Sequence, residues 1–309
     1  MPSVLKIHEQ NASEIDYLWR YYKGEQPILK KTKKVRPDIN NVVLENHAFE
    51  VVEFAKSNAF GEPVQYVQKG EKDTEVVNPE ISTLNRFMAS EDKPSLDNEL
   101  AEWQRIAGTA YRWTDTDMPD DEDEAPFEMS VPDPRRTFVV YSSGIKKEPL
   151  FSGYYSWFSD VTMSESAVQE YNSKYRVITI YTDKFYMEIK ETNGNYVVVP
   201  QTLEIGDETT EVETYPLEPA GQRIIEYPLN TARIGLIELV TTQFDALNKI
   251  KSDDLDGIDQ FVQSLLVFVN QDVSVEDVKE LEEAGAIKVF TNDPRKASRC
   301  EVAYTTVIT

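Results

Sequence analysis

The stretch IIEYPLNTARIGLIELVTTQFDALNKIKSDDLDGIDQFVQSLLVFVN, Ile224–Asn270, holds the longest helical pattern of the chain. After Pro228, apolar side chains recur every three or four residues, as on one face of an α-helix. They are Leu236 or Ile237, Val240, Phe244, Leu247, Ile250 or Lys251, Leu255, Ile258, Val262 and Leu265, with Gly257 as a possible kink. At roughly 1.5 Å per residue this helix would reach some 50 Å, wider than a compact domain. The pattern therefore predicts a helix that packs against copies of itself or crosses a large assembly.

Shorter helices are predicted on the N-terminal side of this stretch. Their apolar residues have helical spacing in Ser13–Tyr22, Asn40–Phe60, Ile81–Ala89 and Ser95–Ala107. Ser95 is the expected N-cap of the last of these helices, because its hydroxyl suits that position. A strand is predicted at Val64–Val67, and His8 is expected in a frayed terminus.

The middle of the chain has the two-residue period of β-strands, from Phe138 to Pro200. Turns at Thr182-Asp183 and Asn193-Gly194 predict an antiparallel meander of Arg176–Tyr181, Lys184–Lys190 and Tyr196–Val199. Further predicted strands are Arg223–Tyr227, Leu265–Val269, Ile287–Phe290 and Glu301–Thr306, with a short helix at Val275–Glu283. The predicted fold class is α+β.

Charge and composition limit the possible functions. The 309 residues include 32 Lys and Arg against 55 Asp and Glu, which gives a net charge of −23. Such a chain repels nucleic acid and anionic membranes over most of its surface, so sequence-specific DNA reading is not expected. A single cysteine, Cys300, excludes an intrachain disulfide framework and suits a reducing cytoplasm. No window is long and apolar enough to span a membrane, so no membrane partner is expected.

Residues for catalysis or cofactor binding are scarce. The chain has two histidines, His8 and His47, and one cysteine, so a zinc site is not expected. It contains no phosphate loop, no G-x-G-x-x-G and no G-x-S-x-G motif. We therefore expect neither an enzyme nor a cofactor. Two alternatives stay open: a hydrolase with a carboxylate pair in the β-rich middle, and an acidic adaptor that binds a basic partner without forming a ring.

Two charged clusters are the candidate contact sites. The first is a basic loop that could touch phosphate or an acidic partner, or simply be an exposed loop: Lys30, Lys31, Lys33, Lys34 and Arg36. The second lies on the long helix, where alternating charge indicates either contact with neighbouring charged helices or an ordinary amphipathic helix. Its residues are Lys249, Lys251, Asp253, Asp254, Asp256 and Asp259.

Three stretches carry a resemblance to a known family. The first combines YYKGEQPI, Tyr21–Ile28, with Asn40–Val67, and includes Gly24, Asn46, Gly61, Pro63 and Val64. The second is the strand region Phe138–Val199, which contains PLFSGYYSW, Pro149–Trp157. The third is Ile224–Asn270, with Glu226, Asn230, Gly235, Glu238, Asp245, Asn248, Ser252 and Phe261. This arrangement resembles the portal proteins of long-tailed, double-stranded DNA bacteriophages.

The resemblance implies a domain organisation. Residues 1–228 would form a helical and antiparallel β wing domain, 229–263 the stem helix, and 264–309 part of a small α/β clip domain. Family members continue with a second stem helix, a tunnel loop and a helical crown. Because this chain ends within the clip, it is expected to be truncated or an abbreviated member.

The resemblance also implies partners and a place in the virion. Portal proteins form rings, usually of twelve, at one capsid vertex, and they are assembled in the cytoplasm of the bacterial host. The implied partners are the terminase large subunit, the major capsid and scaffolding proteins, a head-completion or adaptor protein, and duplex DNA that passes through non-specifically. With this role, Asp253, Asp254 and Asp256 are expected to face the channel or a neighbouring subunit.

Overall fold

The structure is a computed structural model that describes residues 1–34, 36–67, 79–116, 124–163, 169–205 and 208–262. The chain divides into two units, which are considered separately. Unit 1 comprises Met1–Leu29 and Leu44–Ala246, and unit 2 comprises Lys30–Val43 and Leu247–Thr309. The elements predicted between Leu265 and Thr306 lie outside the described residues.

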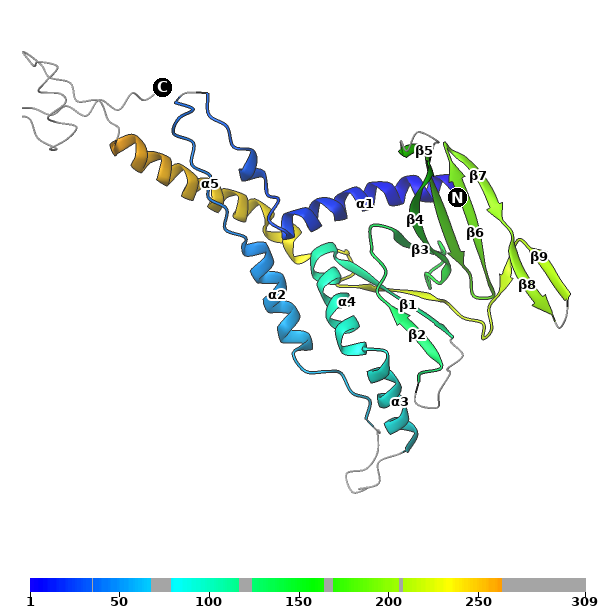
Figure 1. The fold of residues 1–309 in the computed structure, drawn as a ribbon. Coiled ribbons are helices and arrows are strands. Elements are labelled where there is room, and N and C mark those ends of the chain that lie inside the picture. The colour runs from blue at the N-terminus through cyan, green and yellow to red at the C-terminus, as the bar shows by residue number, and fades with distance from the viewer. Residues whose placement is uncertain (35, 68–78, 117–123, 164–168, 206–207, 263–309) are drawn as a thin grey trace, which may run out of the picture. The chain divides into compact units, whose positions relative to one another are not determined.

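The described elements combine helices with antiparallel strands (Figure 1). The helices are α1 (Pro2–Tyr22), α2 (His47–Phe60), α3 (Pro79–Ser90), α4 (Lys93–Ala107) and α5 (Leu236–Val262), with a short 3-10 helix at Pro27–Lys30. The strands are β1 (Thr109–Thr116), β2 (Phe127–Ser130), β3 (Thr137–Tyr141), β4 (Pro149–Met163), β5 (Gln169–Tyr181), β6 (Phe185–Thr192), β7 (Asn195–Val199), β8 (Gln201–Ile205), β9 (Glu208–Val212), β10 (Tyr215–Pro216) and β11 (Ile224–Pro228). The predicted α+β fold class is confirmed.

The described strands pair in three antiparallel groups. One sheet has the order β11-β1-β2, a second has the order β10-β6-β5-β4-β3 with β7 also beside β6, and β8 pairs with β9. The predicted meander is confirmed, since β5, β6 and β7 are consecutive neighbours. Its Asn193-Gly194 turn has φ values of 52° and 82°, which is the left-handed conformation that tight hairpins require.

Helix α1 is longer than predicted and covers one face of the larger sheet. Leu5 packs there in a buried cluster with Phe138, Tyr155, Ile178 and Ile180. Pro2 stands in the first turn, where a missing N–H costs no hydrogen bond. Helix α1 begins at Pro2, so the prediction of a helix that starts at Ser13 was wrong. Polar residues before Ser13 interrupt the apolar pattern, which concealed the first half of the helix.

His8 is buried, so the prediction of a frayed terminus was also wrong. Its ring lies 5.3 Å from the ring of Phe138 and 5.6 Å from that of Tyr155, and Nε2 is 3.2 Å from the carbonyl oxygen of Arg135. Burial lowers the pKa of His8, because desolvation disfavours the charged imidazolium.

Other boundaries differ from the predictions for local reasons. Helix α2 begins at His47, not Asn40, because the Asn46 side chain accepts the Phe49 amide at 3.4 Å and caps the helix. Helix α4 begins at Lys93 with Asp92 in the cap position, so Ser95 is not the N-cap. The stretch predicted as a strand, Val64–Val67, has no regular structure.

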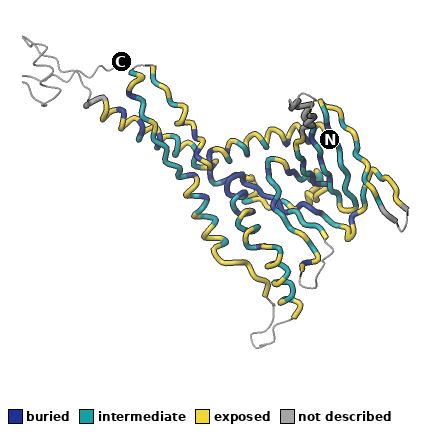
Figure 2. The backbone as a smooth tube through the Cα atoms, in the orientation of Figure 1, coloured by how far each residue is buried: buried dark blue, intermediate teal, exposed yellow. Residues whose placement is uncertain are grey.

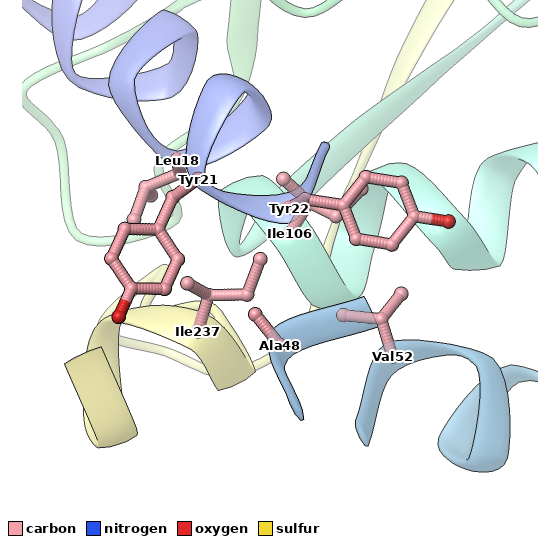
Figure 3. Packing of buried hydrophobic residues seen from close by; sticks show 7 residues of the cluster. All are labelled: Leu18, Tyr21, Tyr22, Ala48, Val52, Ile106 and Ile237. Carbon is pink, nitrogen blue, oxygen red and sulfur yellow. The ribbon is translucent and has the colours of Figure 1, made fainter. Parts of the chain in front are cut away.

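The first half of α5 is anchored in the core of unit 1. Figure 3 shows this cluster, whose members are Leu18, Tyr21, Tyr22, Ala48, Val52, Ile106 and Ile237. Tyr21 points toward α5, where its hydroxyl donates to Asp245 Oδ1 at 2.9 Å, and Tyr22 points toward α2. Figure 2 shows the buried backbone gathering where α1, α4 and β1 meet. The N-terminal half of α5 is therefore held in place by packing against this core.

Candidate functional site

The buried side of α5 in unit 2 is polar. Asn248, Ser252 and Asp256 are spaced four residues apart, so they share one face, and they are only 1%, 0% and 3% exposed. The large apolar residues Ile250 and Ile258 of the same half are exposed. Polar residues, and not apolar ones, therefore determine what this half of the helix binds within its own chain.

The segment that covers this polar face is Lys30–Val43, which we call the strap. The backbone N–H of Val43 donates to Ser252 Oγ at 3.0 Å, and that hydroxyl donates to the carbonyl oxygen of Asn248 at 2.7 Å. The backbone N–H of Asn41 donates to Asp256 Oδ1 at 2.6 Å. These bonds satisfy backbone groups of the strap that would otherwise lose water on burial.

Ion pairs join the strap to the same face. Lys31 Nζ lies 2.7 Å from Asp256 Oδ2 and 2.8 Å from Asp253 Oδ1, and Lys33 Nζ lies 2.5 Å from Asp256 Oδ2. The structure thus brings together members of both predicted clusters, the basic loop and the acidic helix. Asp256 is the centre, since it accepts from two ammonium groups and one amide.

The charge state of Asp256 follows from these partners. Burial alone would raise the pKa of its carboxyl group, but the hydrogen bonds from Lys31, Lys33 and the Asn41 amide outweigh that effect and hold the pKa well below its ordinary value. Desolvation alone would lower the pKa of Lys31, but its hydrogen bonds to Asp253 and then Asp256 outweigh that effect and raise the pKa. Asp256 and Lys31 are therefore both ionised at neutral pH.

The remaining predicted residues are placed differently. Lys30, Lys34, Lys249 and Asp254 are exposed. Asp259 is also exposed, and its Oδ2 accepts the side-chain amide of Asn41 at 2.6 Å. Lys251 is half-buried, and Arg36 lies 3.9 Å from Asp38 at a φ of 51°. These residues are not part of the buried cluster around Asp256.

Sequence reasoning missed the role of the strap backbone. Asn41 was assigned to a helix, although its main-chain and side-chain amides both bind α5. A usable signal was present: the spacing of Asn248, Ser252 and Asp256 marks one helix face as polar, which an apolar core cannot cover.

The family model described as phage portal protein, SPP1 Gp6-like, matches residues 3–306. The chain belongs to this family of phage portal proteins. A comparison with curated proteins gave no match. The resemblance to siphovirus-type portal proteins is confirmed. Membership implies a structural component of the phage capsid that is part of an oligomer.

Several residues on which the resemblance rested hold elements of this portal protein together. Gly24 has a φ of 92°, and an added Cβ would lie 3.5 Å from Asn46 Nδ2. Asn46 also donates to the carbonyl oxygen of Tyr22 at 2.8 Å and accepts from Gln26 Nε2 at 3.0 Å. Asn46 therefore ties the end of α1 to the start of α2.

Glu226 binds several side chains near the start of α5 in the portal protein. Its carboxylate accepts from Thr109 Oγ1 at 3.0 Å, Tyr141 Oη at 2.7 Å, and Arg233 Nε and Nη2 at 2.6 and 2.8 Å. Burial opposes ionisation, but the hydrogen bonds from Arg233 and Tyr141 outweigh it and lower the pKa of Glu226. Burial and the bond to Glu226 raise the pKa of Tyr141 to about 12.

Two glycines let the chain before α5 approach the end of α4. A Cβ on Gly235 would lie 2.3 Å from the carbonyl oxygen of Ile106, and one on Gly108 would lie 2.1 Å from that of Arg233. Both distances are far below van der Waals contact, so side chains are excluded there. This close packing fixes the chain just before α5 against the end of α4 within unit 1.

The described part of the portal protein shows two further features. Its helices include none with both the length and the apolar character needed to cross a bilayer. Among the residues in the described ranges, no group of three His, Cys, Asp or Glu side chains is arranged to hold a metal ion.

Proposed function

We propose that this portal protein forms a ring at one capsid vertex and that the ring is the channel for DNA packaging and ejection. The observation that carries the proposal is the family match, which extends over residues 3–306. In this assignment residues 1–228 form the wing, 229–263 the stem and 264–309 part of the clip. The partners are the terminase large subunit, the major capsid and scaffolding proteins, and a head-completion protein.

The acidic composition supports a channel through which DNA slides. Duplex DNA carries about one phosphate charge per 1.7 Å of axis, so cationic walls would bind it through counterion release. Copies of a chain with a net charge of −23 instead surround a pore with negative potential. The duplex stays centred and moves under the force of a separate ATPase.

Among the candidate residues of α5, we assign Asp254 and Lys249 to the channel or to a neighbouring subunit, because both are exposed. Asp253 and Asp259 are exposed as well, but they bind Lys31 and Asn41 of the strap. Asp256 has a different role in this proposal, since its carboxylate is occupied by Lys31 and Lys33 of its own strap. Lys30 and Lys34 are exposed and are assigned to contact with an acidic partner or DNA.

Native mass spectrometry and negative-stain microscopy test the ring. We expect one discrete oligomer with a central hole. A chain that stays monomeric at all concentrations and in assembled capsids would contradict the proposal. Asp254→Asn tests the channel assignment, with wild-type packaging and unchanged oligomer mass as the result that overturns it.

A further inference from the structure

The loop between β3 and β4 is a tightly bonded hairpin tip, residues 142–148. The backbone N–H of Ser142 donates to the carbonyl oxygen of Glu148 at 2.8 Å, and the N–H of Glu148 donates to Ser142 Oγ at 3.1 Å. At the apex, the N–H of Lys147 donates to the carbonyl oxygen of Gly144 at 3.1 Å. Hydrogen bonds at both the base and the apex therefore close the tip.

The residues at this apex do not suit a turn in water. Ile145 is fully exposed, with a relative accessibility of 104%. Lys146 and Lys147 beside it are exposed, and Lys147 has a φ of 48°. Turns favour Gly, Asn, Asp, Ser and Pro, so neither Ile145 nor Lys147 is explained by local structure. Residues that contradict local preference commonly mark functional surfaces.

A groove in the same unit has complementary properties. It is a cavity of about 1070 Å³ between α1, β3 and the start of α5. Apolar side chains line it, including Ile7, Ile15, Val139 and Ile234. Ile7 is exposed although it is a large aliphatic residue, so the groove presents apolar surface to solvent.

The charge of the groove is negative. Glu14 and Glu238 line it and are exposed. Arg233 is the cationic side chain among its lining residues, and it is bound to the carboxylate of Glu226. An apolar cavity with exposed carboxylates fits an apolar side chain that is flanked by cations.

We propose that the hairpin tip of one copy of this chain inserts into the groove of the next copy. Ile145 enters the apolar floor, and Lys146 and Lys147 pair with Glu14 and Glu238. The contact is heterologous, because the tip and the groove are formed by different residues. Such a contact repeats from one copy to the next, and the copies form a closed ring when the rotation between neighbours permits it. The inference deepens the proposed ring, on which it rests.

Copies with a net charge of −23 repel one another over most of their surface. The tip keeps a positive charge, because Lys146 and Lys147 outnumber Glu148, whose Oε1 lies 3.9 Å from Lys146 Nζ. Its entry into an anionic groove overcomes the repulsion at one defined place. The contact therefore selects the register of neighbouring subunits as well as adding attraction.

Disulfide crosslinking between two single-cysteine variants tests the contact directly. In a Cys300→Ser background, Ile145→Cys is mixed with Ile7→Cys, and the control mixture replaces Ile7→Cys by Val197→Cys, another exposed aliphatic position. We expect a crosslinked dimer at least tenfold more abundant in the first mixture than in the control. Equal yields in both mixtures overturn the inference.

Charge reversal separates this inference from the ring itself. Lys146→Glu with Lys147→Glu should shift the oligomer toward monomer, and adding Glu14→Lys with Glu238→Lys should restore it. Lys6→Glu with Lys184→Glu is the control of equal charge change at exposed positions outside the groove. If the tip variant keeps the wild-type ring, the inference fails and the ring stands. If wild type forms no ring but the specific crosslink appears, the ring fails and the contact stands.

Discussion

Lys31 and Asp256, which lie on opposite sides of the whole β-rich region in sequence, form a largely buried ion pair with Nζ and Oδ2 2.7 Å apart. Their side chains are 13% and 4% exposed. Each residue belongs to a cluster that, in sequence, resembled a contact site for another molecule. The pairing shows that part of this charge is used within the chain, and only the exposed remainder is available to partners.

Asp256→Asn should release the strap from α5. The change removes the charge that balances Lys31 and Lys33, and breaking a buried ion pair costs about 3 kcal/mol. Hydrogen exchange at the Asn41 amide, which donates to Asp256, is the measurement. We expect exchange on the order of 100-fold faster, because a local opening becomes that much more frequent.

Asp254→Asn is the matched control for the strap, because Asp254 is exposed on the same helix. Its effect on Asn41 exchange should be negligible, since exposed substitutions change stability by about 0.5 kcal/mol or less. Equal exchange rates in Asp256→Asn and wild type would show that the ion pairs do not hold the strap.

The sequence predicted the classes of element better than their ends or their partners. Period-two patterning identified the meander, because alternation along a strand is a local property. The start of α2 was missed because it depends on Asn46, whose side chain caps the helix and also bonds to the distant carbonyl oxygen of Tyr22. The burial of His8 was missed for a similar reason, since it depends on a sheet more than a hundred residues away.

The candidate site was predictable only in part. Both charged clusters were visible, and so was the four-residue spacing of Asn248, Ser252 and Asp256. Their pairing was not, because no local rule states which lysine of an exposed-looking loop meets which aspartate of a helix. Only the fold brings Lys31 and Lys33 to the same carboxylate.

Gly235→Ala should destabilise unit 1 by about 1–3 kcal/mol, because the new methyl group overlaps the carbonyl oxygen of Ile106. Backbone atoms must move to relieve the overlap, which disturbs the packing of α5 against α4. Thermal and urea unfolding give the change. Gly144→Ala is the control, since its nearest neighbour lies 3.7 Å away, and a similar loss there would contradict the steric explanation.

Glu226→Gln should lower the free energy of unfolding by about 2 kcal/mol. The amide cannot accept the four hydrogen bonds from Thr109, Tyr141 and Arg233 that the carboxylate accepts. Urea denaturation measures the loss. The exposed Glu213→Gln serves as the control, and an equal effect of both substitutions would refute the importance of the network.

His8 should make stability fall as the solution becomes acidic. Burial lowers its pKa in the folded chain, so the neutral ring is favoured by folding. The stabilisation is present above the unfolded pKa of about 6.5 and is lost as the pH falls through the folded pKa below it. In His8→Gln this acid slope should vanish, as measured by urea unfolding between pH 5 and 6.5. A slope that persists would show that other groups cause it.

His47 should make stability fall as the solution becomes alkaline. Hydrogen bonds to Glu50 and then Glu45, each at 2.8 Å from a ring nitrogen, raise its pKa in the folded chain. Its stabilisation is full below the unfolded pKa of about 6.5 and is lost as the pH rises through the raised folded pKa. Because the chain has only two histidines, wild-type stability should peak near pH 6.5. His47→Gln should remove only the alkaline limb of that peak. An unchanged alkaline limb would mean that the imidazolium does not bridge the two carboxylates.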